Sequence, residues 1–263
     1  MALFATLYSG SSGNCALVSE GGFTILIDMG GSCRRTLNAL YSLGFAARDI
    51  NAILLTHEHS DHVAGLATFL KHYRVPVYGS FGTLSYVKSR GLAPERASLN
   101  YIAAGRKFEL GGIRALPFAT SHDCAESVGY RFELASGKRL AVATDLGYVS
   151  SEVSEALDGC ELVGLEANYE DELLLKGPYP YYLKTRIRSN MGHLSNAESA
   201  RFAAGLAQSG AKRIVLMHLS KENNRPELAL TGCLSQLENA GLSEREIKVS
   251  VAPRMDISEA IEF

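Results

Sequence analysis

Four short apolar segments of this sequence each lead into a side chain that can bind a metal ion. Their β-branched residues predict buried strands. The segments and the side chains that follow them are Ala52–Leu55 with His57, Leu140–Ala143 with Asp145, Leu162–Leu165 with Glu166, and Ile214–Met217 with His218. In layered α/β folds, ligands bind at the carboxyl ends of strands, because the loops there are anchored to the sheet but open to solvent. We therefore expect these four side chains to share one binding site.

Further segments indicate a mixture of strands and helices. Three more apolar runs predict strands, at Phe23–Ile27, Val75–Tyr78 and Ile247–Val251. Helical spacing of apolar residues occurs in four segments, which are Ser32–Leu43, Val63–His72, Asn196–Gln208 and Glu227–Asn239. The third of these helices begins with a capping box, Ser195-Asn-Ala-Glu198, and Gly210 follows its end. These elements predict an α/β or α+β fold.

The chain of 263 residues shows no internal repeat and no long Pro/Gly/Ser linker, so a single domain over residues 1–263 is expected. Apolar runs stop at about half a dozen residues, far below the ~18 that a spanning helix needs, so no membrane partner is expected. The first fifteen residues lack the basic start of a secretion signal, which favours a cytoplasmic location. Five scattered cysteines without a C-x-x-C pair argue against a disulfide framework.

Residues 56–62, THEHSDH, place three imidazoles and an aspartate within six positions. Side chains two apart in an extended turn face the same way, so His57 and His59 can bind one ion while Asp61 and His62 reach a second. A solvated polar loop is the alternative, but seven histidines placed at random rarely put three in one hexapeptide. Imidazole and carboxylate ligands suit zinc, manganese or iron, and the lack of thiolates argues against a structural zinc site.

The remaining ligands of such a site must lie elsewhere in the sequence, and His122, Asp145 and His218 are the candidates. With these residues the sequence resembles the metallo-β-lactamase fold superfamily, whose hallmark is H-x-H-x-D-H followed by a separate His, an Asp and a final His. The resemblance implies a four-layer αββα sandwich that holds two divalent metal ions (Zn, Mn or Fe). The ligand sets it implies are His57, His59 and His122 for the first ion, Asp61, His62 and His218 for the second, and Asp145 as a bridge.

A pair of ions explains why such a site would use this set of ligands. Two cations ~3.5–4 Å apart lower the pKa of a shared water and stabilise the negative charge that develops during hydrolysis. A bridging carboxylate such as Asp145 holds that spacing.

The superfamily contains several chemistries, so the fold alone does not select the reaction. The oxygen-reducing branch has Glu where this sequence has His59, and β-lactamases usually have Cys at the position of Asp145. Five short stretches of sequence resemble the YycJ/WalJ-type bacterial exonuclease family, and they lie at residues 9–15, 143–147, 165–168, 192–196 and 218–224. The similarity runs from about Phe4 to Leu230 and implies 5′-to-3′ degradation of DNA, with a role in DNA mismatch repair.

Because the formal net charge is −2, a nucleic-acid partner would have to be bound by a local basic patch. Lys184, Arg186 and Arg188 are spaced two apart, so an extended segment would display them along one face toward a strand backbone. An ordinary solvated surface is the alternative. These three cations are candidate substrate-binding residues.

They belong to a basic, tyrosine-rich insert near residues 170–192. We expect its tyrosines to pack the insert against the body rather than to stack on bases; these are Tyr179, Tyr181 and Tyr182. Further candidate substrate-binding residues are Lys221, Asn223, Ser11 and Asn14.

His193 is the remaining histidine with a candidate catalytic role. It follows Gly192 and precedes a predicted helix. In related phosphodiesterases a histidine in this context can protonate the leaving oxygen. A structural residue beside the helix is the alternative. Glu166 could orient His193, and the candidate catalytic residues are Asp61, His193 and Glu166.

The leading hypothesis is a dinuclear metal-dependent phosphodiesterase that acts on nucleic acid, as a DNA exonuclease. The alternatives keep the site and change the substrate to tRNA 3′ trailers, to small cyclic phosphodiesters, or to the thioesters of a glyoxalase II-like enzyme. A thioesterase would not need the basic segment, and a metal-binding scaffold without turnover is disfavoured by the complete ligand set. The sequence makes no prediction of the oligomeric state.

Overall fold

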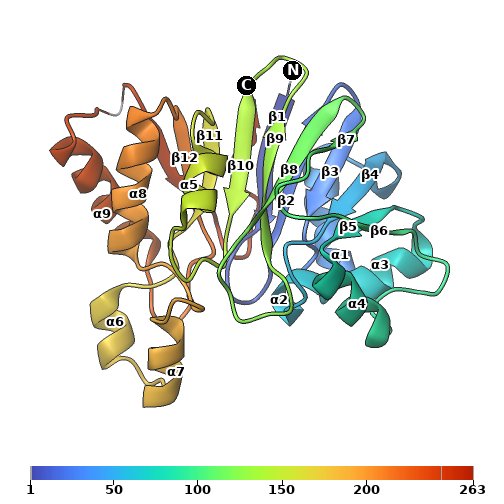
Figure 1. Cartoon of the computed structure of the whole chain (residues 1–263), viewed down its shortest axis with the longest axis horizontal. Helices are drawn as coiled ribbons and strands as arrows, with labels where there is room; N and C mark the ends of the chain where they lie inside the picture. Colours follow the sequence, from blue (N-terminus) through green and yellow to red (C-terminus); the bar gives the residue numbers. More distant parts are fainter. Residues whose placement is uncertain (1, 244, 263) are drawn as a thin grey trace. The chain divides into compact units, whose positions relative to one another are not determined.

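The computed structural model describes residues 2–243 and 245–262, which form two compact units. The first unit comprises the described residues up to Pro117, the short segment Cys124–Val128, and the residues from Pro253 onward. The second unit comprises Phe118–Asp123 and Gly129–Ala252. Figure 1 shows the elements of both units, coloured along the sequence.

The first unit is built on a seven-stranded mixed sheet in the order β14-β1-β2-β3-β4-β5-β6. Strands β1 to β3 pair antiparallel, whereas β3, β4, β5 and β6 pair in parallel. The strands are β1 (Ala2–Tyr8), β2 (Cys15–Glu20), β3 (Phe23–Ile27), β4 (Ile50–Leu54), β5 (Val77–Gly79), β6 (Leu99–Tyr101) and β14 (Ile261–Glu262). The chain then forms a hairpin of β7 (Phe108–Leu110) and β8 (Ile113–Ala119), and the last two residues of β8 fall in the second unit.

Helices cover one face of this first sheet. They are α1 (Cys33–Ser42), α3 (Leu66–His72) and α4 (Phe81–Ser89), with the short α2 (Ser60–Val63) and the 3₁₀ turn η1 (Ala47–Asp49) between them. The helices bury Leu40, Phe69 and Leu84 in one apolar core with Leu26 and Ile53 of the sheet. Strand side chains alternate between faces, and those pointing the other way are buried as well, including Val18, Ile25 and Leu54. Both faces of this sheet are therefore apolar.

The second unit has the same plan. Its strands are β9 (Val128–Glu133), β10 (Arg139–Ala143), β11 (Leu162–Glu166), β12 (Arg213–Met217) and β13 (Lys248–Val251), in the order β13-β12-β11-β10-β9. Strands β10 to β13 are parallel, and β9 is antiparallel to β10. The covering helices are α5 (Ser151–Leu157), α8 (Asn196–Gln208) and α9 (Pro226–Asn239), which share an apolar core with Val163, Leu165 and Ile214.

Each unit thus consists of one mixed sheet and one layer of helices, which are the two sheet layers and two helix layers of the predicted αββα fold. All seven predicted strands and all four predicted helical segments are present, with ends that differ by up to two residues for the strands. The predicted helix Val63–His72 is shorter than expected, because α2 ends at Val63 and α3 begins only at Leu66, after Gly65. Among residues 2–243 and 245–262, no helix has both the length and the apolar character needed to cross a membrane.

The expectation of an extended segment at residues 184–188 is wrong. Residues 184–187 belong to α7 (Tyr181–Ile187), and Arg188 is its C-cap. Helix α7 follows α6 (Asp171–Lys176), and Figure 1 shows the two as a separate pair of short helices. Pro180 precedes the first residue of α7 with an extended backbone, and the helix-favouring Leu183 and Lys184 lie inside it. On a helix, side chains two apart point in different directions, so these cations do not form one row.

The packing prediction for the three tyrosines of this insert is right for one of them. Tyr179 packs against a small apolar core with Leu174 and Ile187. Tyr181 and Tyr182 are 84% and 73% exposed, so for these two side chains the packing prediction is wrong.

Candidate metal centre

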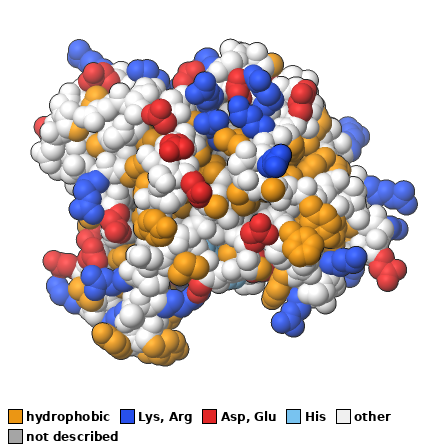
Figure 2. Space-filling view, in the orientation of Figure 1, with side chains coloured by type: hydrophobic (Ala, Val, Ile, Leu, Met, Phe, Trp, Pro, Cys, Tyr) orange, Lys and Arg blue, Asp and Glu red, His pale blue; other side chains and the backbone are white. Residues whose placement is uncertain are grey.

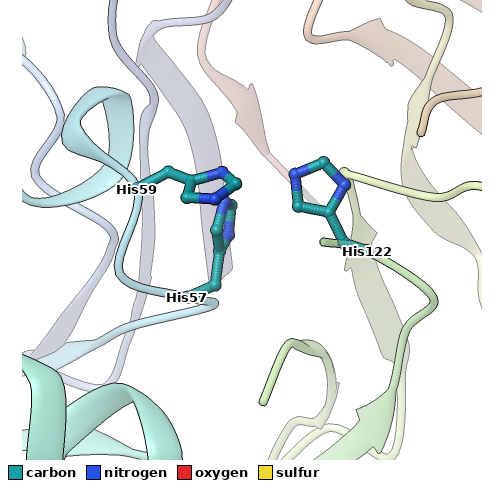
Figure 3. A group of neighbouring side chains, drawn as sticks. All are labelled: His57, His59 and His122. Carbon is teal, nitrogen blue, oxygen red and sulfur yellow. The ribbon is translucent and has the colours of Figure 1, made fainter. Parts of the chain in front are cut away.

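The histidine-rich segment forms the turn after β4 together with the short helix α2, here called the histidine turn, in the first unit. His57 and His62 are buried, while His59 and Asp61 are partly exposed. The ring centroid of His57 lies 4.6 Å from that of His59 and 4.0 Å from that of His62. Figure 3 shows the rings of His57 and His59 meeting edge to face from neighbouring positions of this turn. The ring of His57 is therefore in contact with those of both His59 and His62.

Asp28, a residue that the sequence analysis missed, holds one of these imidazoles in place. Its Oδ2 lies 2.8 Å from His62 Nδ1 and accepts a hydrogen bond from the Thr56 hydroxyl, while its Oδ1 accepts the Thr56 N–H. Burial raises the pKa of Asp28, although His62 and Thr56 act against that shift. A histidine that donates Nδ1–H to a carboxylate keeps Nε2 as its ligand atom, as metal-binding histidines commonly do. Asp28 directly follows the predicted strand Phe23–Ile27, so the strand-end rule used for the other candidates would have found it.

Two loops of the first unit fix the backbone of the same turn. The N–H of Asn14 donates to Asp61 O at 2.8 Å, and the N–H of Met29 donates to His62 O at 2.8 Å. A Cβ on Gly30 would lie 1.6 Å from Asp61 O, so this close approach requires glycine. Asn14 Nδ2 also lies 3.1 Å from His62 Nε2. Asn14, predicted to bind substrate, is thus buried against the histidine turn.

Five chemically active side chains that are far apart in the sequence lie together in the second unit, and they are His122, Asp145, Glu166, His193 and His218. The ring centroid of His193 is 5.0 Å from that of His122 and 5.2 Å from that of His218. Asp145 Oδ1 lies 3.5 Å from His122 Nε2 and 3.6 Å from His218 Nδ1. One potential ligand atom from each of Asp145, Glu166, His193 and His218 lies within 4.8 Å of the others. The structure thus brings these candidates into one cluster.

Glu166 is the centre of this second cluster. Its Oε1 lies 2.8 Å from Nδ1 of both His193 and His218, and its Oε2 accepts the N–H groups of Leu146 and Leu194 at 2.8 and 3.1 Å. Burial by itself raises the pKa of Glu166, but His193 and His218 outweigh it and lower the pKa to about 2. The ionised carboxylate therefore accepts from both rings and leaves their Nε2 atoms for other partners.

His122, the third side chain drawn in Figure 3, follows β8 in the second unit. Its Nδ1 lies 3.0 Å from the carbonyl oxygen of Gly192. Because a carbonyl can only accept, Nδ1 carries the proton and Nε2 is the acceptor of the neutral ring. Burial lowers the pKa of His122, which favours the neutral form that binds metal.

Three of the residues in these clusters have a left-handed backbone. Asp28, Asp145 and His218 have φ angles of 62°, 59° and 57°, and they are the only non-glycine residues with positive φ among those the structure describes. Asp28 directly follows β3, His218 directly follows β12, and Asp145 follows β10 after one residue. Such a conformation is unfavourable for most residues and is retained where surrounding structure or function requires it.

The donor set of these clusters fits divalent metal ions. Every candidate ligand is an imidazole nitrogen or a carboxylate oxygen, which zinc, manganese and iron accept. The second nitrogen of His62, His122 and His218 is held by Asp28, Gly192 O and Glu166 respectively, as is typical of metal-binding histidines. These His/Asp clusters can therefore bind metal ions.

The candidate substrate-binding cations on and beside α7 are engaged by neighbouring groups. Arg186 is paired with Asp123, whose Oδ1 lies 3.5 Å from His122 Nε2. Arg188 Nε lies 3.7 Å from Asp171, and Lys184 Nζ donates to Leu175 O at 2.7 Å. Asn223 has no exposed surface, and Ser220 Oγ accepts its N–H. Of the other two candidates, Lys221 is exposed in the second unit and Ser11 is exposed in the first.

Comparisons with known proteins agree with this fold. The Beta-lactamase superfamily domain matches residues 24–219. Exodeoxyribonuclease YycJ of Bacillus anthracis is 34% identical over 244 residues, which cover 92% of this chain and 92% of that protein. Ribonuclease Z of Methanopyrus kandleri is 29% identical and covers 78% of this chain and 79% of its own. The metallo-β-lactamase fold protein YhfI from Bacillus subtilis superposes with a TM-score of 0.75 at 15% identity, over 98% of this chain and 99% of YhfI. The chain is therefore a metallo-β-lactamase fold hydrolase and belongs to the YycJ-type family.

Proposed function

We propose that this enzyme is a two-metal phosphodiesterase that degrades DNA from a 5′ end, with a role in DNA repair and a cytoplasmic location. The observation that carries the proposal is the 34% identity to an exodeoxyribonuclease over 92% of both chains. The proposed metal ligands, from His57 to His218, all fall within the residues matched by the superfamily domain. The substrate class is thus inferred from a relative that matches this chain along almost all its length.

The ligand sets that we propose are His57, His59 and His122 for one ion, Asp61, His62 and His218 for the other, and Asp145 between them. Two divalent ions held by such a set supply Lewis-acid stabilisation of the charge on a phosphodiester and activate water for attack on phosphorus. The chain's own contribution is to keep each imidazole in the tautomer that offers Nε2. Asp28, Gly192 O and Glu166 do this for His62, His122 and His218.

His193 has the contacts expected of a proton donor. Its Nδ1 donates to Glu166, so a second proton on the ring is carried by Nε2. Hydrolysis forms a bond between a water oxygen and phosphorus, with loss of a proton from that water, and breaks the bond between phosphorus and the leaving oxygen, which must then gain a proton. We propose that His193 Nε2 gives that proton, that Glu166 stabilises the resulting ring orientation, and that Asp61 acts only through the metal it binds.

A substrate panel tests the reaction. Purified protein is analysed for bound metal and then assayed on 5′- and 3′-labelled single- and double-stranded DNA, on RNA, on a small phosphodiester and on a thioester. We expect mononucleotides to be released from the 5′ end of DNA and the activity to be lost on chelation. Faster cleavage of RNA would favour the function named for the Ribonuclease Z relative, and faster cleavage of the thioester would overturn the phosphodiesterase proposal.

A second experiment tests the role of His193. The His193→Ala variant should lose ~10²–10⁴-fold in turnover, the usual contribution of a general acid, while its metal content stays unchanged. His72, which is exposed on α3, gives the matched control variant His72→Ala, with turnover and metal content like those of the unaltered protein. Equal loss of metal and of turnover in His193→Ala would make His193 a metal ligand instead.

A further inference from the structure

The segment between α3 and β7 in the first unit carries a charge opposite to that of the whole chain. Residues 71–108 contain seven basic side chains and one acidic side chain, Glu95, for a formal charge of +6, whereas the whole chain has −2. The seven basic side chains are all exposed, and they are Lys71, Arg74, Lys88, Arg90, Arg96, Arg106 and Lys107. Within the described chain, the ion pairs to carboxylates involve other residues, for example Arg48 with Asp49. None of the seven is thus paired with a carboxylate among the described residues. Arg96 donates one N–H to Lys71 O at 2.9 Å and has further N–H groups for an anionic partner.

Two of these cations line one groove. Arg74 and Arg96 face it together with Tyr73, Pro76 and Ser98. A guanidinium group offers paired N–H donors in a geometry that matches phosphate oxygens. The groove therefore combines two phosphate-binding side chains with an aromatic side chain and a hydroxyl.

The same segment also exposes a pair of aromatic rings. The ring centroids of Phe81 and Tyr101 lie 5.5 Å apart, and the side chains are 68% and 53% exposed. In Figure 2, hydrophobic side chains (orange) and Lys and Arg side chains (blue) gather over the region of α4, β5 and β6. Exposed aromatic faces beside positive charge are the usual platform on which single-stranded nucleic acids stack their bases.

Sheet topology places this aromatic pair at the same edge as the histidine turn. Strands β3 to β6 are parallel, so their carboxyl ends lie along one edge of the sheet. His57 follows β4, Phe81 follows β5 after one residue, and Tyr101 is the last residue of β6. With roughly 4.8 Å between neighbouring strands, the end of β6 lies about 10 Å along the edge from that of β4. That spacing corresponds to a few nucleotides of an unpaired strand.

A direct contact ties α4 to the histidine turn. Glu58, between His57 and His59, accepts the N–H of Ala125 at 2.7 Å, and its other oxygen lies 3.5 Å from the Thr83 hydroxyl in α4. The Ser80 hydroxyl caps α4 and donates to Glu126 O. Phe81 thus stands on a helix that is anchored to the turn carrying the candidate metal ligands.

Helix α7 of the second unit, by contrast, offers less free positive charge. Arg186 is paired with Asp123, Arg188 with Asp171, and the nearby Lys176 with Glu172. A phosphate would have to compete with these carboxylates for the same side chains. The surface of residues 71–108 is therefore the better candidate for binding a strand.

We propose that the surface formed by residues 71–108, here named the basic-aromatic surface, binds an unpaired DNA strand. Bases stack on Phe81 and Tyr101 at the carboxyl ends of β5 and β6. The DNA strand then runs along these two β-strands, so that its phosphates reach Arg74 and Arg96 in the groove at their amino ends, about 10 Å away. This inference rests on the proposed function, because the strand held here is the one whose end would be hydrolysed at the histidine turn.

Binding is tested apart from chemistry with the full-length, metal-loaded protein. The probe is a fluorescein-labelled oligothymidylate of about 12 nucleotides with phosphorothioate linkages, which resist hydrolysis, and the readout is fluorescence anisotropy. The double variant Phe81→Ala, Tyr101→Ala should weaken binding by about 5-fold or more, from the loss of base stacking. The matched control is Tyr181→Ala, Tyr182→Ala, which removes two rings of α7 that are even more exposed and should leave the Kd within about twofold.

A second pair of variants tests the phosphate contacts. The variant Arg74→Ala, Arg96→Ala should flatten the dependence of log Kd on log salt by about 1.4, since each lost contact to a single strand removes about 0.7. The control Arg245→Ala, Lys248→Ala removes two exposed cations of the second unit and should leave the slope unchanged. Circular dichroism and the Tm of every variant show that it is folded.

Three outcomes would overturn the inference: an unaltered protein that does not bind the probe, a Phe81/Tyr101 variant with unchanged affinity, or an α7 control that weakens binding as strongly. These outcomes differ from failure of the proposed function. An unaltered protein that degrades DNA while the Phe81/Tyr101 variant binds normally refutes only the basic-aromatic surface. A protein that binds through this surface and hydrolyses no nucleic acid refutes only the exonuclease.

Discussion

Glu166, which has no exposed surface, holds two imidazoles with one oxygen and two backbone N–H groups with the other. The Glu166→Gln variant keeps the shape of the side chain but replaces one acceptor oxygen by an NH₂ donor. This NH₂ group must face other donors, either the Nδ1–H groups of the two imidazoles or the two backbone N–H groups. Loss of a carboxylate behind metal-binding histidines typically costs about 10–100-fold in metal affinity or activity. We therefore expect a loss of that size, measured as turnover and as metal affinity by competition with a chelating dye.

The control for this change is Glu172→Gln on α6, which removes an exposed carboxylate that pairs with Lys176. It should leave both turnover and metal affinity as in the unaltered protein. If Glu166→Gln retained full activity and metal content, the two imidazoles would have to be oriented by something other than this carboxylate.

Asp28 combines a left-handed backbone with the bond to His62, and two substitutions separate these roles. Asparagine tolerates positive φ, so Asp28→Asn should keep the fold and lower metal affinity by about 10–100-fold, because the neutral amide is a weaker acceptor for His62. Asp28→Ala should show the same metal defect and in addition a lower Tm, since alanine is strained at this φ and leaves Thr56 without its acceptor. Isothermal titration with zinc and thermal melts measure the two effects, and equal Tm values for both variants would contradict the backbone part of the argument.

At the scale of elements, the capping box of α8 is a local feature with a measurable contribution. The Ser195 hydroxyl accepts the N–H of Glu198, and the Glu198 carboxylate accepts the N–H of Ser195. Ser195→Ala removes the first bond and should lower the free energy of unfolding by about 0.5–2 kcal/mol, measured by urea denaturation. Ser154→Ala on the exposed face of α5 is the control and should stay within about 0.5 kcal/mol of the unaltered protein. A loss for Ser154→Ala as large as that for Ser195→Ala would show that the cap is not the cause.

The elements that the sequence predicted well are those with a signal of their own. Apolar runs bounded by polar residues identified β10, β11 and β12, and the capping box located the start of α8. Strand β1 and helix α7, by contrast, were not predicted. The first residues were considered as a targeting signal rather than as a strand, and the alternate spacing of Lys184, Arg186 and Arg188 is compatible with any exposed backbone. Charge spacing alone does not determine whether a segment is helical or extended.

The residues of the candidate site also fall into two groups, those that a local sequence motif reveals and those whose role depends on distant partners. His57, His59, Asp61 and His62 are adjacent in the sequence, so a motif reveals them together. Asp28 directly follows a predicted strand but lies outside the H-x-H-x-D-H motif, and its role of holding His62, 34 positions away, is visible only from the contact between them. The structural role of Asn14 was likewise invisible, because nothing in a loop rich in glycine and serine tells whether an amide faces solvent or a buried backbone.

For the whole molecule, metal removal is the most informative test, because the proposed ligands come from both units. Ions that bind only the folded chain stabilise it by about 2.7 kcal/mol at a free concentration 100 times the Kd. For a chain of this size that corresponds to a Tm shift of about 5–11 °C, so chelation should lower the Tm by that amount and readdition of zinc or manganese should restore it. Hydrogen exchange should lose protection near β4 and α2 in the first unit and at the ends of β10 and β12 in the second, in the same chelator titration. If metal analysis showed complete removal while only one unit lost protection, the ions would be held by that unit alone, and the shared ligand sets proposed here would be wrong.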